Sequence, residues 1–189
     1  MSDLRSIIYD AGVPVEGHFI FADGDHALIK LEMDTLWHHP KELGIVLDAL
    51  AVAERLPQPD VILGVPTGGQ KLADELVKSG RLSIPIAYLE RVPGGTKQDF
   101  RFVSKQDEEL ASAATHIRIY EDVVTTLSSI AGVVKLLNPE QQEIHSLAIW
   151  RRGVVKEVYR VGVQDHYLVE EVMPSFAPGI CPYPGCKKR

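Results

Sequence analysis

Residues 117–129 hold the side chains with the clearest chemical potential in the chain. An apolar run over residues 117–120 leads into two adjacent carboxylates, Glu121 and Asp122, and then into a turn rich in hydroxyl groups. The hydroxyl groups of that turn belong to Thr125, Thr126, Ser128 and Ser129. Where such a turn follows a buried parallel strand and opens a helix, its backbone amides and hydroxyl groups can bind a phosphate.

The two carboxylates narrow the identity of the molecule that carries this phosphate. Glu121 and Asp122 would repel a bare phosphate, so their place beside it indicates the vicinal hydroxyl groups of a sugar or a bridging divalent cation. A helix cap alone would explain one acid and one hydroxyl group, but not the whole set. The segment therefore predicts a site for a ribose phosphate.

A second segment, residues 63–69, has the form of another phosphate-binding loop. It reads Leu-Gly-Val-Pro-Thr-Gly-Gly and joins an apolar run to a helical pattern. The pair Gly68 and Gly69 lets backbone N–H groups approach a ligand because no Cβ stands in the way. Alone, such a segment is equally well a tight turn. Its spacing from the first motif, that of a β-α-β unit, favours a binding role.

The elements that would position these loops follow from hydrophobic periodicity. A short N-terminal helix is followed by two apolar-rich runs, residues 18–21 and 27–32, on either side of a turn at Gly24, which indicates a hairpin. An amphipathic helix is expected from Pro40 to near Pro57.

From residue 60 onward, short buried runs alternate with helices. The apolar runs cover residues 61–65, 86–89, 117–120 and 144–150, and the helical patterns cover residues 72–77 and 130–137. This alternation predicts an α/β fold with a parallel sheet flanked by helices. We expect one domain, 1–189, with an N-terminal hood and helix (1–57), a core (58–150), and C-terminal strands with a Pro-rich tail (151–189).

Residues 90–114 interrupt the alternation. The stretch is polar and contains a Pro-Gly-Gly turn, and so long a break between strands is usually a functional flap or a disordered insertion. We expect a mobile flap over residues 92–103.

Composition sets limits on the class of protein. The 189 residues include 26 acidic and 20 basic side chains, a net charge of −6, which argues against nucleic acid or an anionic membrane as a partner. The chain start lacks an export signal and no apolar run could cross a bilayer, so we expect a soluble cytoplasmic protein. The only cysteines, Cys181 and Cys186, could form half of a zinc site or a short disulfide loop; we favour two reduced thiols in a tail.

Residues 117–126 resemble the phosphoribosyl diphosphate signature of type I phosphoribosyltransferases, and the form Glu-Asp-Val-Val-Thr-Thr is most similar to orotate phosphoribosyltransferases. The likeness covers nearly the whole chain, including the 63–69 loop and the N-terminal hairpin. It implies the type I fold with a hood and a flexible flap. It also implies transfer of a phosphoribosyl group from phosphoribosyl diphosphate to orotate in pyrimidine biosynthesis, with Mg²⁺, in a homodimer whose flap serves the neighbouring subunit.

The resemblance also implies roles for individual residues. Glu121 and Asp122 would orient the ribose and meet Mg²⁺ largely through the ligand, and the flap residues Lys97 and Arg101 would assist catalysis. Either Arg151 or Arg152 falls where the family pairs an arginine with the base; we predict Arg151, together with His26, as base-binding. The predicted phosphoribosyl diphosphate-binding residues are Thr125, Thr126, Leu127, Ser128, Ser129, Thr67, Gly68, Gly69 and Arg91.

The chain departs from the family pattern at three places. Leu127 and Ser128 stand where glycines usually follow the threonine pair, and the flap contains no histidine. The turn over residues 22–26 contains acids that would repel an anionic base. These departures keep two alternatives open: a transferase for another base, including a purine, or a non-catalytic regulator that binds a phosphoribosyl compound or a nucleotide.

Overall fold

The computed structural model describes residues 3–21, 24–52, 56–160, 162–184 and 186. Within these ranges, none of the helices has the length and apolar character needed to span a membrane.

A five-stranded, entirely parallel sheet forms the core, in the order β4-β3-β7-β8-β9. Its strands are β4 (Ile86–Ala87), β3 (Val61–Gly64), β7 (His116–Val124), β8 (Glu143–Arg151) and β9 (Gln164–Glu170). The predicted α/β fold is thereby confirmed. Strand β9 belongs to this sheet, so the core continues beyond residue 150, where we expected it to end.

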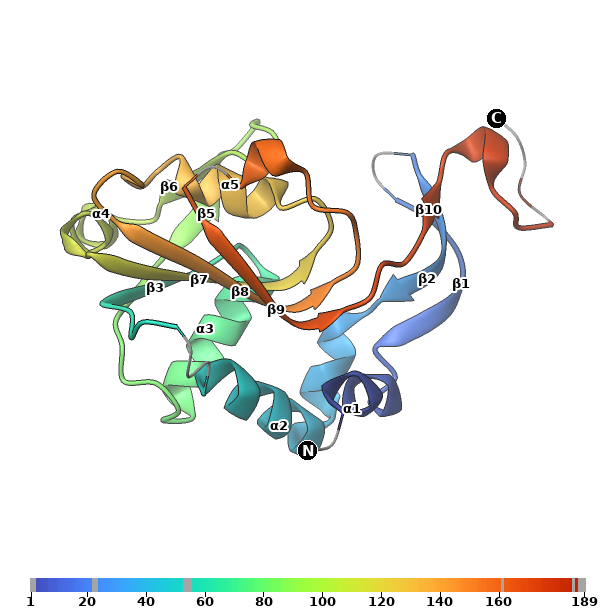
Figure 1. Ribbon diagram of the computed structural model, residues 1–189, viewed down its shortest axis with the longest axis horizontal. Coiled ribbons are helices and arrows are strands. Elements are labelled where there is room, and N and C mark those ends of the chain that lie inside the picture. The colour runs from blue at the N-terminus through green and yellow to red at the C-terminus, as the bar shows by residue number, and fades with distance from the viewer. Residues whose placement is uncertain (1–2, 22–23, 53–55, 161, 185, 187–189) are drawn as a thin grey trace.

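Two apolar layers cover the sheet because side chains alternate along each strand. Ile62 of β3 faces one layer, while its neighbours Val61 and Leu63 face the other. The first layer contains α1 (Leu4–Asp10), α2 (Pro40–Ala51) and α3 (Gly68–Lys78), and the second contains α4 (Lys105–Ala113) and α5 (Ser128–Val134). Figure 1 shows α1, α2 and α3 together below the sheet.

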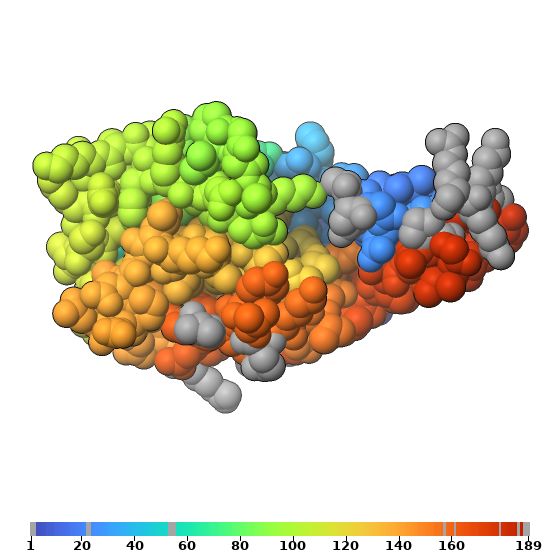
Figure 2. All heavy atoms as spheres, turned by 90° about the horizontal axis from the view of Figure 1, so that it is seen from above, coloured from blue at the N-terminus to red at the C-terminus, as the bar shows by residue number. Residues whose placement is uncertain are grey.

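A separate three-stranded antiparallel sheet forms the hood, in the order β1-β2-β10. Strand β1 (Pro14–Ile20) and strand β2 (His26–Leu31) form the expected hairpin, and β10 (Ser175–Phe176) adds to β2. A 3-10 helix (Met33–His38) connects the hood to α2. The N-terminal hairpin and the C-terminal tail therefore lie side by side, away from the core sheet (Figures 1 and 2).

Several element boundaries differ from the prediction. Helix α2 ends at Ala51 instead of near Pro57, and β7 continues to Val124 instead of stopping at Tyr120. Between residues 151 and 173 the described strand is limited to β9, preceded by a 3-10 turn (Glu157–Tyr159). A further 3-10 turn (Pro178–Ile180) follows β10.

The polar stretch over residues 90–114, expected to be a functional flap or a disordered insertion, contains regular elements. Strands β5 (Leu89–Arg91) and β6 (Phe100–Phe102) pair as an antiparallel hairpin, and α4 follows directly. The Ser104 side chain caps α4 by accepting a hydrogen bond from the Asp107 backbone N–H, and Asp107 in turn accepts one from Tyr88 N–H at 2.9 Å. A Ser followed three residues later by an acid is a helix-start pattern, so the sequence contained the signal for α4.

Candidate active site

A hollow with a volume of about 920 Å³, within the range of small-molecule sites, opens where β7 ends. Its walls come from the end of β7, the loop to α5, the segment after β8, the hood and the loop of the β5–β6 hairpin. The lining residues that matter for chemistry are Glu121, Thr125, Thr126, Leu127, Ser128, Ser129, Arg152, Lys97, Gln98, Phe21 and Asp25. The hydroxyl-rich loop therefore faces open space, as a ligand site requires.

A second hollow of about 340 Å³ adjoins the first. The two share Phe21, Val123, Thr125 and Arg152 as wall residues. The smaller one adds Thr67, Gly68, Lys71 and Asp122, together with residues 30–34. The two loops that the sequence marked as phosphate-binding are thus brought to one continuous region.

Gly68 and Gly69 permit a close approach between α3 and β7. A Cβ at Gly69 would overlap the carbonyl oxygen of Tyr120, and a Cβ at Gly68 would overlap the carboxylate of Asp122. The backbone of the loop is also tied to β7, since Val65 N–H donates to Tyr120 O at 2.9 Å. The glycines are required by packing, and this packing holds Asp122 against the loop.

The adjacent carboxylates Glu121 and Asp122 occupy different environments. Glu121 is buried, and this burial, together with the neighbouring Asp122 charge, raises its pKa well above the ordinary value. Its Oε1 accepts the Asp122 backbone N–H at 3.1 Å. Asp122 is half-buried at the smaller hollow, where its Oδ1 accepts the Val123 N–H at 2.7 Å. Glu121 is therefore predisposed to the neutral form, which can donate a hydrogen bond.

The loop from Thr125 to Ser129 is ordered by local contacts. Thr126 Oγ1 donates to Ser128 Oγ at 3.0 Å. Leu127 has φ 72°, a left-handed conformation that glycine adopts more readily, yet its side chain is buried in the apolar layer with Ile130. The core therefore accommodates the leucine that replaces the family's glycine.

Arg151, the last residue of β8, and Arg152, which follows it, point to opposite sides, as successive residues of an extended chain do. Arg152 is 7% exposed, lines both hollows and lies over the Phe21 ring at 4.8 Å; burial lowers its pKa. Arg151 instead pairs with Glu170 at 2.6 Å and lies over the Tyr167 ring. We favoured Arg151 at the site, but Arg152 is the arginine that faces it.

The remaining predicted residues divide into two groups. Lys97 lines the larger hollow of its own chain, and Arg91 donates to Pro66 O at 2.7 Å and to Lys97 O, which ties the hairpin loop to the 63–69 loop. Arg101 pairs with Glu90 at 2.6 Å and lines neither hollow.

His26, predicted as base-binding, also lies outside both hollows. It is 5% exposed in the hood, beside His18, Cys181 and Cys186. Of the acidic turn that precedes it, residues 22 and 23 fall outside the described ranges.

Sequence reasoning missed Phe21, Gln98 and Gly153. The first two line the larger hollow, and a Cβ at Gly153 would overlap the carbonyl oxygen of Thr125, so this glycine lets the segment after β8 pack on the hydroxyl-rich loop. A glycine three residues beyond the end of the predicted strand 144–150 was the available signal for it.

The fold and the paired loops define a type I phosphoribosyltransferase. The solved structure of orotate phosphoribosyltransferase from Aeropyrum pernix superposes with a TM-score of 0.70 at 25% identity, covering 88% of this chain and 93% of that one. No family model matches the chain.

Sequence comparison then identifies the family within this class. The chain is 30% identical over 184 residues to orotate phosphoribosyltransferase 2 of Mesorhizobium japonicum, covering 95% of this chain and 90% of the relative. It is 27% identical over 186 residues to the orotate phosphoribosyltransferase of Thermotoga maritima, covering 98% and 92%. The chain belongs to the orotate phosphoribosyltransferase family.

Proposed function

We propose that the protein transfers the phosphoribosyl group of phosphoribosyl diphosphate to orotate, forming orotidine 5′-phosphate and pyrophosphate in pyrimidine nucleotide biosynthesis. The observation that carries this proposal is the meeting of the hydroxyl-rich loop, the glycine loop and a buried arginine at one continuous region. Family membership supports the same activity.

The hydroxyl-rich loop is the proposed 5-phosphate site. Thr125, Thr126, Ser128 and Ser129 line the larger hollow, and their hydroxyl groups and the loop amides supply several hydrogen-bond donors. Thr67 and Gly68 of the neighbouring loop line the smaller hollow, which suits the diphosphate. Gly69 and Arg91 support that loop through packing and through the Arg91 bond to Pro66.

The two carboxylates suit the ribose that would lie between these loops. Asp122 presents an acceptor to the ribose hydroxyl groups, while Glu121, with its raised pKa, can donate a hydrogen bond to one of them. This division explains why two acids beside two phosphate loops do not repel the substrate.

Arg152 is the proposed partner of the orotate carboxylate. Its guanidinium is largely desolvated and forms no ion pair with any carboxylate among the described residues, so a substrate carboxylate would supply the missing counter-charge. Phe21 lies beside Arg152 and offers an aromatic face to a flat base. This arrangement favours orotate over a base that carries no charge.

Mg²⁺ fits this donor set in a restricted way. Asp122 has a carboxylate oxygen at the smaller hollow, whereas the burial and raised pKa of Glu121 make it a poor direct ligand. Asp122 would therefore hold the ion together with oxygens of the substrate. When bound, Mg²⁺ neutralises charge on the departing diphosphate.

The reaction needs orientation more than proton transfer. A bond forms between a ring nitrogen of orotate and the anomeric carbon as the bond from that carbon to the diphosphate oxygen breaks. The electron pair of the broken bond leaves with pyrophosphate, and the hydrogen of the ring nitrogen is released as a proton. Arg152 would orient the base, and Lys97 would stabilise negative charge from the hairpin loop above the larger hollow. The hairpin loop would also exclude water from the larger hollow during the transfer.

A homodimer and a cytoplasmic location stay proposals. Lys97 lines the hollow of its own chain here, so the neighbour is not required to deliver it. Light scattering of the purified protein at several concentrations measures whether a dimer forms.

The test is pyrophosphate release from phosphoribosyl diphosphate and Mg²⁺ with a panel of bases that begins with orotate. Orotate-dependent release that is lost in Asp122→Asn supports the proposal. Release with adenine or another base alone would assign a different acceptor, and binding of phosphoribosyl diphosphate without release with any base would indicate a non-catalytic regulator.

A further inference from the structure

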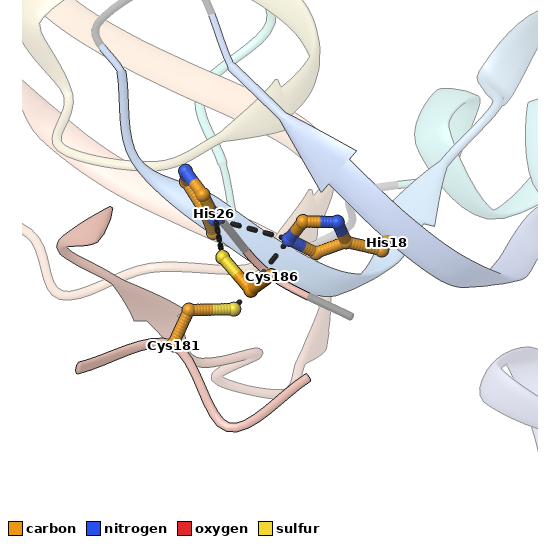
Figure 3. A group of neighbouring side chains, drawn as sticks. All are labelled: His18, His26, Cys181 and Cys186. Carbon is orange, nitrogen blue, oxygen red and sulfur yellow. Dashed lines mark hydrogen bonds between the residues drawn. The ribbon is translucent and has the colours of Figure 1, made fainter. Parts of the chain in front are cut away.

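Four side chains with metal-binding atoms meet in the hood, away from the proposed active site. They are His18, His26, Cys181 and Cys186, and one ligand atom from each lies within 4.8 Å of all the others. Figure 3 shows the two imidazoles and the two thiols pointing toward one another. None of the four lines either hollow of the candidate active site.

The distances among these atoms are those of a small coordination sphere. His18 Nε2 lies 3.0 Å from His26 Nδ1, Cys186 Sγ lies 3.1 Å from His26 Nδ1, and Cys181 Sγ lies 3.5 Å from His18 Nε2. In a tetrahedral zinc site with ordinary bond lengths, neighbouring ligand atoms are separated by roughly 3.3 to 3.8 Å. The three distances differ from that range by at most about 0.3 Å, and the remaining pairs lie within 4.8 Å, so a shift of about 1 Å or less would bring the four atoms to that geometry.

Hydrogen bonds alone explain the cluster poorly. An imidazole nitrogen has either one hydrogen or one lone pair, so His26 Nδ1 cannot bond well to both His18 Nε2 and Cys186 Sγ. The same difficulty holds for His18 Nε2, which faces both His26 and Cys181. A cation at the centre removes the conflict because each atom then directs a lone pair to it.

The cluster joins parts of the chain that are far apart in sequence. His18 lies on β1 and His26 on β2, while Cys181 ends the last 3-10 turn and Cys186 follows it. Pairing of β10 with β2 brings the tail back to the hairpin, with Phe176 opposite His26. The Tyr183 ring stacks on His18 at 4.5 Å, which fixes the orientation of that imidazole.

We propose that His18, His26, Cys181 and Cys186 form a structural Cys2His2 zinc site that fastens the C-terminal tail to the hood. Two thiolates and two imidazoles suit zinc better than magnesium or calcium, which prefer oxygen ligands. Four protein ligands leave no open position for a substrate, so the role is structural. The inference is independent of the proposed transferase activity.

The site has a consequence for the neighbouring hollow. The hood supplies Phe21 and Asp25 to the wall of the larger hollow. Pro174 and Ser175, at the start of β10, also line it. Zinc bound at the cluster would stabilise both segments together, since it links the hairpin to the tail.

The test measures zinc in the full-length chain, purified without a metal-affinity tag and dialysed against metal-free buffer after exposure to Zn²⁺. We expect about one zinc per chain in the parent and in His38→Gln/His39→Gln, and less than about a tenth in Cys181→Ser/Cys186→Ser and in His18→Gln/His26→Gln. The His38 and His39 pair controls for loss of two histidines outside the cluster, since neither belongs to it.

A second measurement on the parent protein keeps the proposal testable if the variants fold poorly. Co²⁺ bound to two thiolates in a tetrahedral site gives intense visible absorption and a thiolate charge-transfer band, and Zn²⁺ should abolish both. Zinc content near zero in the parent, a Co²⁺ spectrum without thiolate bands, or zinc retained after removal of both cysteines would overturn the proposal. A Cys181–Cys186 disulfide that persists in reducing buffer, with no metal bound, would overturn it as well.

Discussion

The two sides of the proposed active site are built by different means. On the core side, every residue of β3 is buried and seven consecutive residues of β8 are buried between two apolar layers. On the hood side, β1 has no buried residue, and Ile20 is 65% exposed. The half of the site proposed to bind the phosphoribosyl group is therefore held by hydrophobic burial, whereas the half proposed to meet the base depends on a thin sheet and on what fastens it.

This contrast predicts that the same kind of substitution has unequal effects on the two sides. The largest effect is expected for Gly69→Ala, because the added Cβ would overlap the Tyr120 carbonyl oxygen between α3 and β7. We expect a loss of about 3 kcal/mol or more in the free energy of unfolding, measured by urea denaturation. Gly179→Ala in the tail, where a Cβ meets nothing within 4 Å, is the matched control and should be neutral. Equal stability of the two variants would contradict the contrast.

The next effect concerns the arginine that links the two sides. Arg152→Ala should raise the KM for orotate about 30-fold or more, since it removes a charged hydrogen-bond partner worth ~2 kcal/mol or more. Arg151→Ala, whose native side chain pairs with Glu170, should change it by less than about threefold. Steady-state kinetics with both variants measures the difference, and the reverse order would return the base-binding role to Arg151.

A third prediction tests how the core side tolerates Leu127. Leu127→Ala keeps the left-handed backbone and loses the buried side chain, so it should destabilise the protein by about 2–3 kcal/mol. Leu127→Gly should be less destabilising by about 1 kcal/mol, because glycine relieves the positive φ. Thermal and urea unfolding compare the two variants; glycine as the more destabilising change would show that the backbone there is not strained.

The smallest change is expected in the pH dependence of stability. The pKa of Glu121 is raised in the folded state, so its contribution to stability is full below the ordinary pKa of a glutamate and is lost as pH rises through the raised value. Glu121→Gln should remove that loss and stabilise the protein at neutral and alkaline pH.

Glu143→Gln provides a comparison of opposite sign. A hydrogen bond from His145 lowers the Glu143 pKa, so its contribution is present above the ordinary value and is lost as pH falls through the lowered one. Melting temperatures of both variants between pH 4 and 9 test these opposite pH dependences. Parallel profiles for the two variants would refute the prediction.

The sequence predicted well the strand, turn and helix start that hold residues 121–129. Residues 121–129 lie together in the chain, and a strand that runs into a hydroxyl-rich turn has one common geometry. The alternation of apolar runs likewise predicted the parallel sheet, because strands buried on both faces and separated by helices have few other arrangements.

The remaining parts depended on contacts between distant segments. Arg151 and Arg152 are chemically alike, and only the direction of each side chain at the end of β8 separates them. His26 resembled a base-binding residue until the pairing of β10 with β2 brought the cysteines to it. The folded state of residues 105–113 was missed because their polar composition outweighed the capping pattern at Ser104.

The pairing of β10 with β2 also bears on how the protein is made. During synthesis, β1 and β2 leave the ribosome before any strand of the core sheet, while β10 and both cysteines emerge after all of them. The hairpin must therefore wait, with an unpaired strand edge, until every strand of the core sheet and then β10 have been translated. The region that is proposed to recognise the base is thus completed after the core sheet, and a growing chain would hold its phosphate loops before it could select a substrate.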